Sequence, residues 1–502
     1  MIRGLEMKEY VLSIDRGTTQ IKVCLVDNSG QQVAVVSRPS PKMVSSEKEW
    51  YEQDMNEIYD ETASAIQDML SYGYSAENIK AVGVTGQGNG IFLIDKAGLP
   101  IRPAIMPMDV RASAICESMD KKGISSQIKQ INFFGVPSCS PLALLNWIKD
   151  NEPEKYEKIC YVLSCKDWIR FRLTGEVGTD ITDTSGAGLV DMQTGTYSNR
   201  IFKLADLEGV WKKMPEIHAP FEIAGMISKK AEKETGLKTG TPVVYGAHDI
   251  AACALGTGMR EKGDLAIAAG TFGICLGVLS EPQLIGKYST TLKHVLPDKW
   301  LSHYSIRAFG NSLDWFIRLL CEEEIREAQK RGLSVYTVLE EKIDVSKTVD
   351  ILVRPYIYGS MTGEDAGDIL RIRPWHTKAD IIQSIYQGLA YAFTEAIQWY
   401  REALGTEKVY ICGGGAKSRV IGQLIADASG IPVYASTEKE ETCKGAALCA
   451  WMGLDRSLGS ELIRNASKSS NIWKPNVALY EKHQENLEAI SKMNQHLWRN
   501  RV

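Results

Sequence analysis

The chain has 502 residues, which is too long for one ordinary hydrophobic core, so we expect two or three domains. Hydrophobic residues make up 44% of the chain and charged residues 24%, as in ordinary soluble globular proteins, and no apolar run approaches the ~20 residues that a membrane helix needs. The net charge is only -4 and Lys and Arg form no long block, which argues against nucleic acid or an acidic membrane as the main partner.

A first hairpin, over 12–27, carries an acid that its turn does not need. Asp15 ends an apolar strand, and a Gly-Thr-Thr turn at 17–19 leads into the second strand. A plain hairpin would need only Asn-Gly or Asp-Gly at its turn. Glycine N–H groups and threonine hydroxyls suit phosphate oxygens, and a neighbouring carboxylate can hold Mg²⁺, usually through water. The hairpin therefore predicts a phosphate-binding turn with Asp15 beside the metal.

A helix is predicted over 51–72, because apolar side chains recur there with a spacing of about 3.6 residues. Residues 79–90 indicate a short buried strand that runs into a glycine loop, Gly-Gln-Gly-Asn-Gly. Two more helices are predicted in the middle of the chain, one ending near Pro153 and the other near Gly175. The first half thus contains a hairpin, a helix, a strand and a glycine loop in that order.

The second half of the chain repeats this order. A strand that ends in Asp249 and a helix of small residues come first, and a second hairpin then turns at Gly270-Thr271. The strand and glycine loop at 407–418 correspond to those of the first half. Such a repeat predicts two related α/β lobes whose glycine turns hold a polyphosphate across a cleft, although Gly-Thr pairs also recur by chance.

Other functional signatures are missing from the sequence. It contains no complete Walker A loop, dinucleotide fingerprint, nucleophile elbow or zinc-protease motif. The 11 cysteines and 7 histidines are scattered without ligand spacing, so we expect no structural metal. Most of the cysteines lie in apolar runs, which is typical of buried thiols in a reducing cytoplasm, and we expect a cytoplasmic protein.

Nine segments, among them VGVTGQGNG, AAGTFG and CGGGAKS, are similar to the FGGY family of carbohydrate kinases in the family's order. The nine segments are 14–30, 82–90, 108–112, 144–154, 166–176, 179–191, 243–258, 268–273 and 412–418. The resemblance implies an α/β fold of two duplicated actin-like (RNase H-like) lobes, with ATP in the cleft between them and a sugar or polyol deeper inside. It implies an N-terminal lobe over 1–253 that mainly binds the sugar and a C-terminal lobe over 254–502 that mainly binds ATP.

The resemblance also implies roles for single residues. Asp249 matches the catalytic base, although an acid at the start of a helix can instead serve as its cap. Asp15 matches the acid near the Mg²⁺. The positions that match ATP-binding residues are Thr18, Thr19, Lys22, Gly270, Thr271, Gly310, Asp314, Gly414, Gly415 and Ser418. The positions that match the lining of the sugar site are Gln87, Gly88, Asn89, Asp109 and Arg111. A local surface ion pair is the alternative for Asp109 and Arg111.

Departures from the family pattern narrow the range of candidate substrates. Gly88-Asn89 stand where glycerol kinases carry Arg-Glu and D-xylulose kinases usually carry Met-His. Leu144 replaces a usual lysine, and the segment 358–363 replaces a usual Gly-Glu-Arg. The chain most resembles L-xylulose kinases, with erythritol kinases as neighbours. We therefore expect ATP- and Mg²⁺-dependent phosphorylation of a ketopentose such as L-xylulose, with erythritol, D-xylulose or glycerol as alternative substrates.

Two other classes of protein remain alternatives. A non-enzymatic actin-like ATPase module would share the glycine turns and Asp15, and a sugar-sensing regulator would share the sugar side. The polar groups expected around the sugar, together with Asp249 as a proton acceptor, favour the kinase. The resemblance is also compatible with a homodimer.

Overall fold

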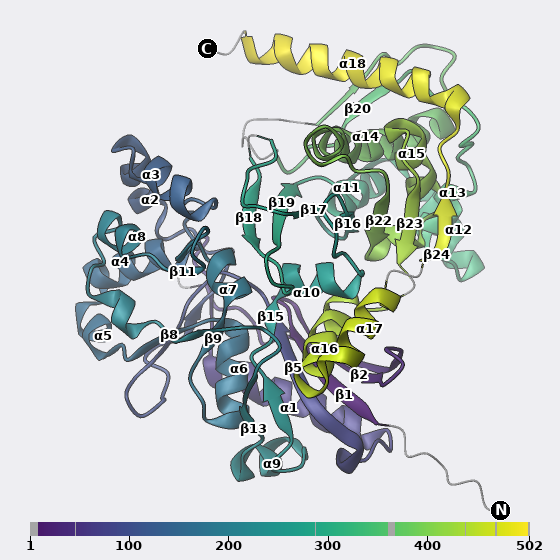
Figure 1. Ribbon diagram of the computed structural model, residues 1–502. Coiled ribbons are helices and arrows are strands. Elements are labelled where there is room, and N and C mark those ends of the chain that lie inside the picture. The colour runs from purple at the N-terminus through teal and green to yellow at the C-terminus, as the bar shows by residue number, and fades with distance from the viewer. Residues whose placement is uncertain are drawn as a thin grey trace, which may run out of the picture.

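Two seven-stranded mixed sheets organise the chain into two lobes (Figure 1). The computed structural model describes residues 9–45, 47–286, 288–359, 367–436, 438–466 and 469–499. The first sheet has the order β13 (Ile223–Met226), β14 (Pro242–Val244), β5 (Ile79–Gly86), β1 (Tyr10–Arg16), β2 (Gln20–Asp27) and β3 (Gln32–Pro39), and β15 (Ala247–His248) also pairs with β5. The second sheet has the order β18 (Thr290–Lys293), β19 (Trp300–Ile306), β17 (Gly273–Leu279), β16 (Leu265–Ala269), β22 (Val409–Cys412), β23 (Val433–Ser436) and β24 (Ser469–Trp473).

The two sheets share one arrangement at their centres. β1 pairs antiparallel with β2 and parallel with β5, and β16 pairs in the same two ways with β17 and β22. Because β5 and β22 run parallel to β1 and β16, the glycine loop after each of them lies at the same sheet edge as the hairpin turn. The strand pairing therefore confirms the predicted repeat of hairpin, strand and glycine loop.

Helices from the first half of the chain cover one face of the first sheet. They are α1 (Met55–Ser71), α6 (Cys165–Thr174) and α9 (Lys229–Thr235). The helix predicted over 51–72 begins later, because residues 52 and 53 form strand β4 (Glu52–Gln53) and Asp54 caps α1 by accepting from the N–H groups of Asn56 and Glu57. The predicted helices that end near Pro153 and Gly175 are also present.

The opposite face of the first sheet is covered from a distant part of the chain. Helices α10 (Asp249–Gly256) and α16 (Glu441–Leu454) pack against each other there, and α16 contacts β1, β2 and β5. A Cβ added at Gly445 would lie 1.8 Å from the carbonyl oxygen of Ala252, so only glycine permits this close approach of the two helices. The division of the chain between 253 and 254 remains a prediction, and that position falls within α10.

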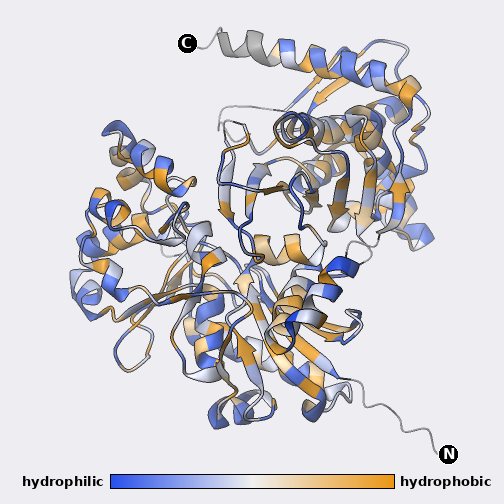
Figure 2. Cartoon of the chain, viewed as in Figure 1, coloured by the Kyte–Doolittle hydropathy of each residue, from blue (hydrophilic) through white to orange (hydrophobic). Residues whose placement is uncertain are grey.

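The second sheet has its own helical layer. It consists of α11 (Gly310–Leu320), α14 (Lys378–Leu404), α15 (Arg419–Ser429) and α18 (Val477–Arg499). At the start of α14, Thr377 and Asp380 form a capping box in which each side chain accepts from the backbone of the other residue. Hydrophobic residues line the central strands of both sheets in Figure 2. Each lobe thus has its own apolar core, and a third apolar cluster contains residues of both sheets, such as Val11 and Ala266.

The remaining elements are short and lie around these layers. Five two-stranded ribbons are formed by β4 with β7 (Ala104–Ile105), β6 (Phe92–Ile94) with β8 (Tyr161–Leu163), β9 (Thr179–Asp180) with β12 (Ile217–His218), β10 (Val190–Asp191) with β11 (Thr196–Tyr197), and β20 (Leu352–Arg354) with β21 (Asp368–Leu370). The remaining helices are α2 (Ser113–Lys121), α3 (Ile124–Asn132), α4 (Pro141–Asn151), α5 (Pro153–Lys158), α7 (Ile181–Gly186), α8 (Asn199–Leu204), α12 (Glu322–Arg331), α13 (Val335–Glu340), α17 (Arg456–Ala466) and the 3-10 helices η1 (Ala76–Asn78), η2 (Val210–Lys213) and η3 (Gly414–Lys417). Leu144 is fully buried in α4, which packs in a separate apolar cluster beside the first sheet. Residues 360–363 of the segment 358–363 lie outside the described residues.

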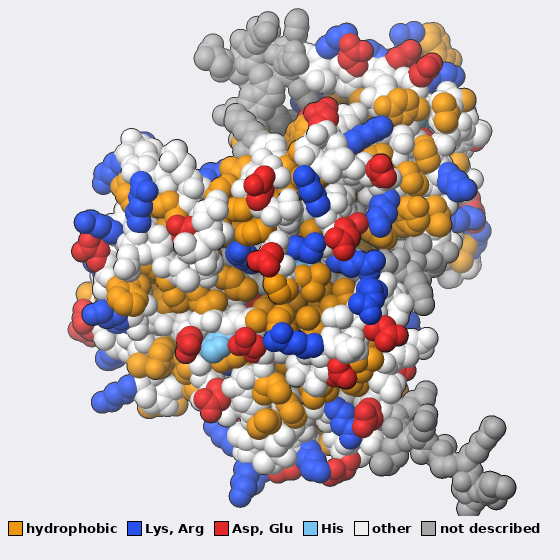
Figure 3. Space-filling model, viewed as in Figure 1, with side chains coloured by type: hydrophobic (Ala, Val, Ile, Leu, Met, Phe, Trp, Pro, Cys, Tyr) orange, Lys and Arg blue, Asp and Glu red, His pale blue; other side chains and the backbone are white. Residues whose placement is uncertain are grey.

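The visible surface carries both signs of charge, and the cysteines, all of which the structure describes, form no disulfides. On the face shown in Figure 3, Lys and Arg side chains alternate with Asp and Glu side chains. All 11 cysteines are free, and seven of them are buried. Within the described ranges, no helix is both long enough and apolar enough to span a bilayer.

Candidate active site

Three strand ends place the two predicted acids at one edge of the first sheet. β1 and β15 both run parallel to β5, so their carboxyl ends point the same way. Asp15 lies near the end of β1 opposite Thr85, and His248, the last residue of β15, lies opposite Gly86. Asp249 follows directly as the first residue of α10. The fold therefore brings Asp15 and Asp249 close together, while their roles remain predictions.

The carboxylates of Asp15 and Asp249 influence each other. Burial, and next the negative charge of Asp249, raise the pKa of Asp15 to about 7, although the ammonium of Lys22 acts in the opposite direction. A divalent cation beside Asp15 would relieve this repulsion, and carboxylate oxygens are ligands that Mg²⁺ accepts. The described residues contain no group of three or more His, Cys, Asp or Glu side chains that could hold a metal ion alone. These residues therefore fit an Mg²⁺ ion whose other ligands are phosphate oxygens and water.

Asp249 is held in place by its neighbour His248. Nδ1 of His248 lies 2.9 Å from Oδ1 of Asp249, and the His248 side chain is only 5% exposed. Burial opposes a charge on His248, but the carboxylates of Asp249, Asp183 and Asp180 together outweigh burial and raise the pKa of the imidazole. The N–H of Ile250 donates to Oδ1 of Asp249 at 2.7 Å, but the residue that caps α10 is His248, whose Nδ1 accepts from the same N–H at 3.2 Å. The Asp249 side chain is nevertheless 36% exposed, so its carboxylate is both held and accessible.

The glycine loop after β5 packs directly against His248. A Cβ added at Gly88 would lie 1.9 Å from Nε2 of His248, so only glycine fits there. Asn89 has a left-handed backbone with a φ of 59°, and its Oδ1 is buried without a hydrogen-bond partner in the part of the chain that the structure describes. Gln87 accepts a hydrogen bond of 2.6 Å from the hydroxyl of Thr18. The loop therefore links the predicted sugar side to the first phosphate turn.

Thr18, Thr19 and Lys22 lie together on the first hairpin. Thr19 is exposed and Thr18 is half-buried, so both hydroxyls stand at the turn. Nζ of Lys22 lies 2.5 Å from Oε2 of Glu440, the residue before α16, and this bond raises the pKa of Lys22 although burial opposes it. The first turn is thus tied by an ion pair to the segment that leads into α16.

A pocket of about 590 Å³ gathers the ATP-binding residues that were predicted for the second lobe. The residues of that set that line it are Gly270, Thr271, Gly310, Asp314, Gly414, Gly415 and Ser418. They come together because the turn between β16 and β17, the start of α11 and the loop after β22 meet at one sheet edge. The N–H of Gly310 donates to the carbonyl of Gly270 at 3.2 Å, which joins two of these segments.

Sequence reasoning missed one wall of this pocket. Tyr336, Thr337 and Glu340 of α13 also line it, and the hydroxyl of Tyr336 donates to the carboxylate of Asp314. The six-residue helix α13 carries no recognisable motif and reaches the pocket only through the tertiary fold. His248 was missed as well, although its position directly before Asp249 was a usable signal.

Asp109 and Arg111 form a buried pair and not a surface pair. The Arg111 and Asp109 side chains are 1% and 0% exposed, and Nη2 of Arg111 lies 2.8 Å from Oδ2 of Asp109. Arg111 also pairs with Glu52 at 2.7 Å and has its guanidinium 4.6 Å from the Trp50 ring and 5.0 Å from the Trp147 ring. Since the pair is engaged on several sides, a direct contact with a sugar would require this network to open.

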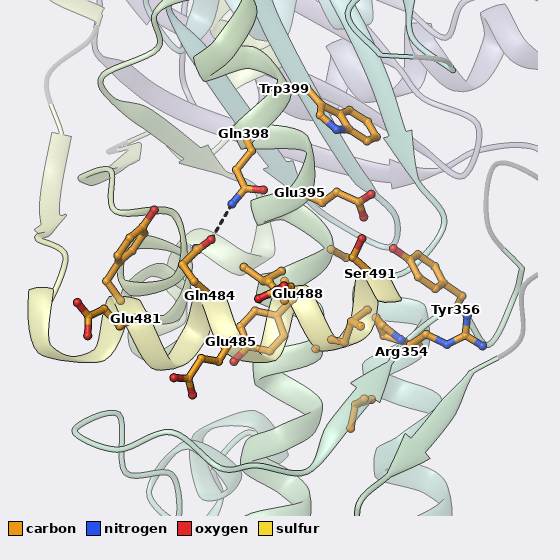
Figure 4. A pocket seen from close by; sticks show the side chains of 18 residues that line it. Arg354, Tyr356, Glu395, Gln398, Trp399, Glu481, Gln484, Glu485, Glu488 and Ser491 are labelled. Carbon is orange, nitrogen blue, oxygen red and sulfur yellow. Dashed lines mark hydrogen bonds between the residues drawn. The ribbon is translucent and has the colours of Figure 1, made fainter. Parts of the chain in front are cut away.

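A second pocket, of about 770 Å³, lies in the second lobe away from these residues (Figure 4). Its walls are α14, α18 and the end of β20, and the carboxylates of Glu395, Glu481, Glu485 and Glu488 are among its lining groups. None of the site residues expected from the sequence lines it.

Comparisons with known proteins identify the family and the fold of the chain. Models of the N-terminal and the C-terminal domain of the FGGY family of carbohydrate kinases match residues 10–256 and 265–454. The chain is 28% identical over 460 residues to a probable L-xylulose kinase of Pasteurella multocida, covering 89% of this chain and 91% of the relative. It is 29% identical over 458 residues to an L-xylulose/3-keto-L-gulonate kinase of Escherichia coli, covering 89% of each chain. A solved xylulose kinase from Rhodospirillum rubrum is similar in fold, with a TM-score of 0.88, 24% identity and coverage of 98% of this chain and 99% of that one. The predicted two-lobed α/β fold is thereby confirmed.

Proposed function

Because the chain belongs to the FGGY family of carbohydrate kinases, it is a sugar kinase, and we propose that it phosphorylates a ketopentose, with L-xylulose as the leading substrate. The names of the relatives from P. multocida and E. coli support this substrate class. The main observation against glycerol as the substrate is the contact of Gly88 with His248. This contact leaves no room at position 88 for the arginine that glycerol kinases carry there. Erythritol, D-xylulose and glycerol are the alternative substrates.

In the proposed reaction, the sugar hydroxyl attacks the γ-phosphorus of ATP while the bond from that phosphorus to the bridging oxygen breaks and ADP leaves, and Asp249 accepts the proton of the hydroxyl. A positioned carboxylate of this kind contributes roughly 10²–10⁴-fold to the rate. His248 orients Asp249, and the backbone and hydroxyl donors of the two glycine turns hold the phosphate oxygens in line. A bound Mg²⁺ beside Asp15 would supply further positive charge to the phosphate oxygens.

The two lobes have different tasks in this proposal. The pocket of about 590 Å³ in the second lobe would hold the nucleotide, since its wall combines the glycine turns with the apolar side chains of Phe309 and Leu313. The first lobe contributes the loop at Gln87–Asn89 and the base. The cytoplasmic location and the homodimer expected from the sequence remain predictions.

Replacing Thr271 with valine is expected to raise the KM for ATP about tenfold, because the change removes a hydroxyl donor from the second turn. The KM for the sugar should change little. Thr194→Val, at an exposed threonine between β10 and β11, is the matched control. Both constants are measured with a coupled assay of ADP release. An ATP constant equal to that of the control would contradict a phosphate-binding role for the second turn.

Among candidate substrates we expect the highest kcat/KM for L-xylulose. The test is ADP release with L-xylulose, D-xylulose, the ribuloses, erythritol, glycerol and 3-keto-L-gulonate, each over a range of concentrations. Glycerol should be a poor substrate because the chain has no Arg-Glu pair at Gly88-Asn89. Efficient phosphorylation of glycerol, above that of every pentulose and tetritol, would overturn the proposed substrate class.

A further inference from the structure

A pocket of about 670 Å³ opens beside Asn89, and both lobes form its walls. The first lobe contributes Asn89, residues of α2 and α3, and the loop that follows α3. The second lobe contributes residues of β18 and β19. The lobes touch at this place through backbone, since the N–H of Thr291 in β18 donates to the carbonyl of Phe133 at 3.0 Å. The pocket is thus a junction of the two lobes next to the sugar loop.

The strand pairing presents three polar side chains of the second lobe to this pocket. Thr290 and His303 are directly opposite each other in the antiparallel pair of β18 and β19. Ser305 lies two residues after His303 and therefore on the same face of β19. Oγ1 of Thr290 lies 3.1 Å from Nδ1 of His303, and Oγ of Ser305 lies 3.1 Å from Nε2. All three residues line the pocket and are partly exposed.

The imidazole of His303 sets the hydrogen-bonding roles of the two hydroxyls. Burial, and next the charge of His248, lower the pKa of His303 to about 4, so the ring is neutral near pH 7. A neutral ring donates from one nitrogen and accepts at the other. One neighbouring hydroxyl therefore donates its hydrogen to the unprotonated ring nitrogen and can only accept a hydrogen bond from a ligand. The other hydroxyl accepts from the ring N–H and can still donate its own hydrogen to a ligand. Thr290 and Ser305 thus present one acceptor and one donor, a combination that matches the hydroxyls of a sugar chain.

The first lobe contributes Asn89 to the wall of the same pocket. Its Oδ1 is buried and has no hydrogen-bond partner among the described residues, a costly state unless a ligand supplies the donor. His303 senses the charges of both His248 and Asp249, so the pocket adjoins the edge where the base lies. The charged groups of the wall, Asp120 and Lys129, have opposite signs, which favours an uncharged polyol chain over a sugar acid.

We infer that Thr290, His303 and Ser305 bind the hydroxyls of the ketose at the end remote from the phosphorylated one, opposite Asn89, so that the sugar site is completed by the second lobe. This inference rests on the proposed function. It makes the three residues specificity determinants for the sugar, separate from the nucleotide pocket of the same lobe. A sugar bound in this way contacts both lobes at once and favours the arrangement in which they meet.

The test uses Ser305→Ala and Thr290→Val, which remove single hydroxyls, with Ser280→Ala, an exposed serine of the same lobe, as control. Each variant is expected to raise the KM for L-xylulose roughly tenfold and to leave the KM for ATP within about twofold, as the loss of one hydrogen bond to the sugar predicts. The assay is repeated with 1-deoxy-L-xylulose and 5-deoxy-L-xylulose. The analogue that is still phosphorylated lacks the remote hydroxyl.

On that analogue at least one of the two variants should match the wild type, because the hydroxyl that it would bind is already gone. A KM for L-xylulose equal to that of the Ser280→Ala control in both variants would overturn the inference. Equal losses on L-xylulose and on the analogue in both variants would also overturn it, because they indicate an indirect structural effect. If the wild type phosphorylates L-xylulose in these experiments, the proposed function stands whatever the variants show. If the wild type phosphorylates no sugar of the panel, the proposed function fails and the inference with it.

Discussion

Replacing Asp249 with asparagine is expected to lower turnover by roughly 10²-fold or more, because an amide cannot accept the proton of the attacking hydroxyl. Asparagine keeps the size of the side chain, and its carbonyl oxygen can still accept from the N–H of Ile250, which now donates to Asp249 at 2.7 Å. Folding, ATP binding and sugar binding should therefore be largely retained. Turnover is measured at saturating L-xylulose and ATP, and ligand binding is measured by calorimetry.

The matched control is Asp54→Asn, an identical change at the start of α1. Asp54 accepts from two backbone N–H groups and lies outside the cleft residues, so this variant should keep wild-type turnover. If Asp249→Asn retains more than about a tenth of the wild-type rate, well short of the share expected of a general base, Asp249 acts as a cap or orients the sugar. The proton acceptor would then be a different group.

The second large effect is expected from Gly88→Ala. The new methyl group would overlap the His248 ring, which also packs closely against Gly186, where an added Cβ would lie 2.8 Å from Cδ2 of the ring. Displacing His248 would move Asp249, to which it is joined at 2.9 Å. A displacement of about 1 Å at a reacting group can cost on the order of 10²-fold, so we expect a loss of that order in kcat/KM for the sugar.

Gly209→Ala controls for the substitution itself, since a Cβ added at Gly209 meets nothing within 4 Å. Thermal unfolding of both variants separates a local shift from a general loss of stability. The KM for ATP should remain within about twofold in each, because the nucleotide pocket is formed by other segments. A kcat/KM for the sugar within about threefold of the wild type would show that the contact between Gly88 and His248 does not govern the geometry of the site.

The sequence predicted those parts of the site that short motifs determine. The repeated order of hairpin, strand and glycine loop was visible because glycine, threonine and acidic residues recur at corresponding places. Gly270, Thr271, Gly414 and Gly415 accordingly line one pocket. These residues lie in two short motifs, each at the end of a strand, so the local sequence was enough to find them.

The parts that escaped prediction depend on partners far away in the chain. Asp109 and Arg111 could be recognised as a pair, but their burial depends on Glu52, Trp50 and Trp147, which no local pattern connects to them. In the sequence, His303 of β19 has no feature that distinguishes it from other strand residues. Its place in a pocket depends on β18 and the first lobe, which only the tertiary fold brings beside it. The sequence also could not predict which sheet α16 packs against. Its residues are buried almost throughout, so its apolar pattern does not point to one sheet.

The position of α16 has a consequence for how the protein is made. Val11, Val26 and Ala81 belong to the sheet face that α16 covers, where they share an apolar cluster with Leu448 and Trp451. At a synthesis rate of roughly 5–20 residues per second, α16 leaves the ribosome roughly 10–40 s after α10. During that time this face of the first sheet lacks α16, while the central strands of the second sheet, β16, β17 and β22, are being synthesised. The lobe that is translated first is therefore completed only after most of the second lobe has been synthesised, and β24 and α18 of the second lobe follow α16.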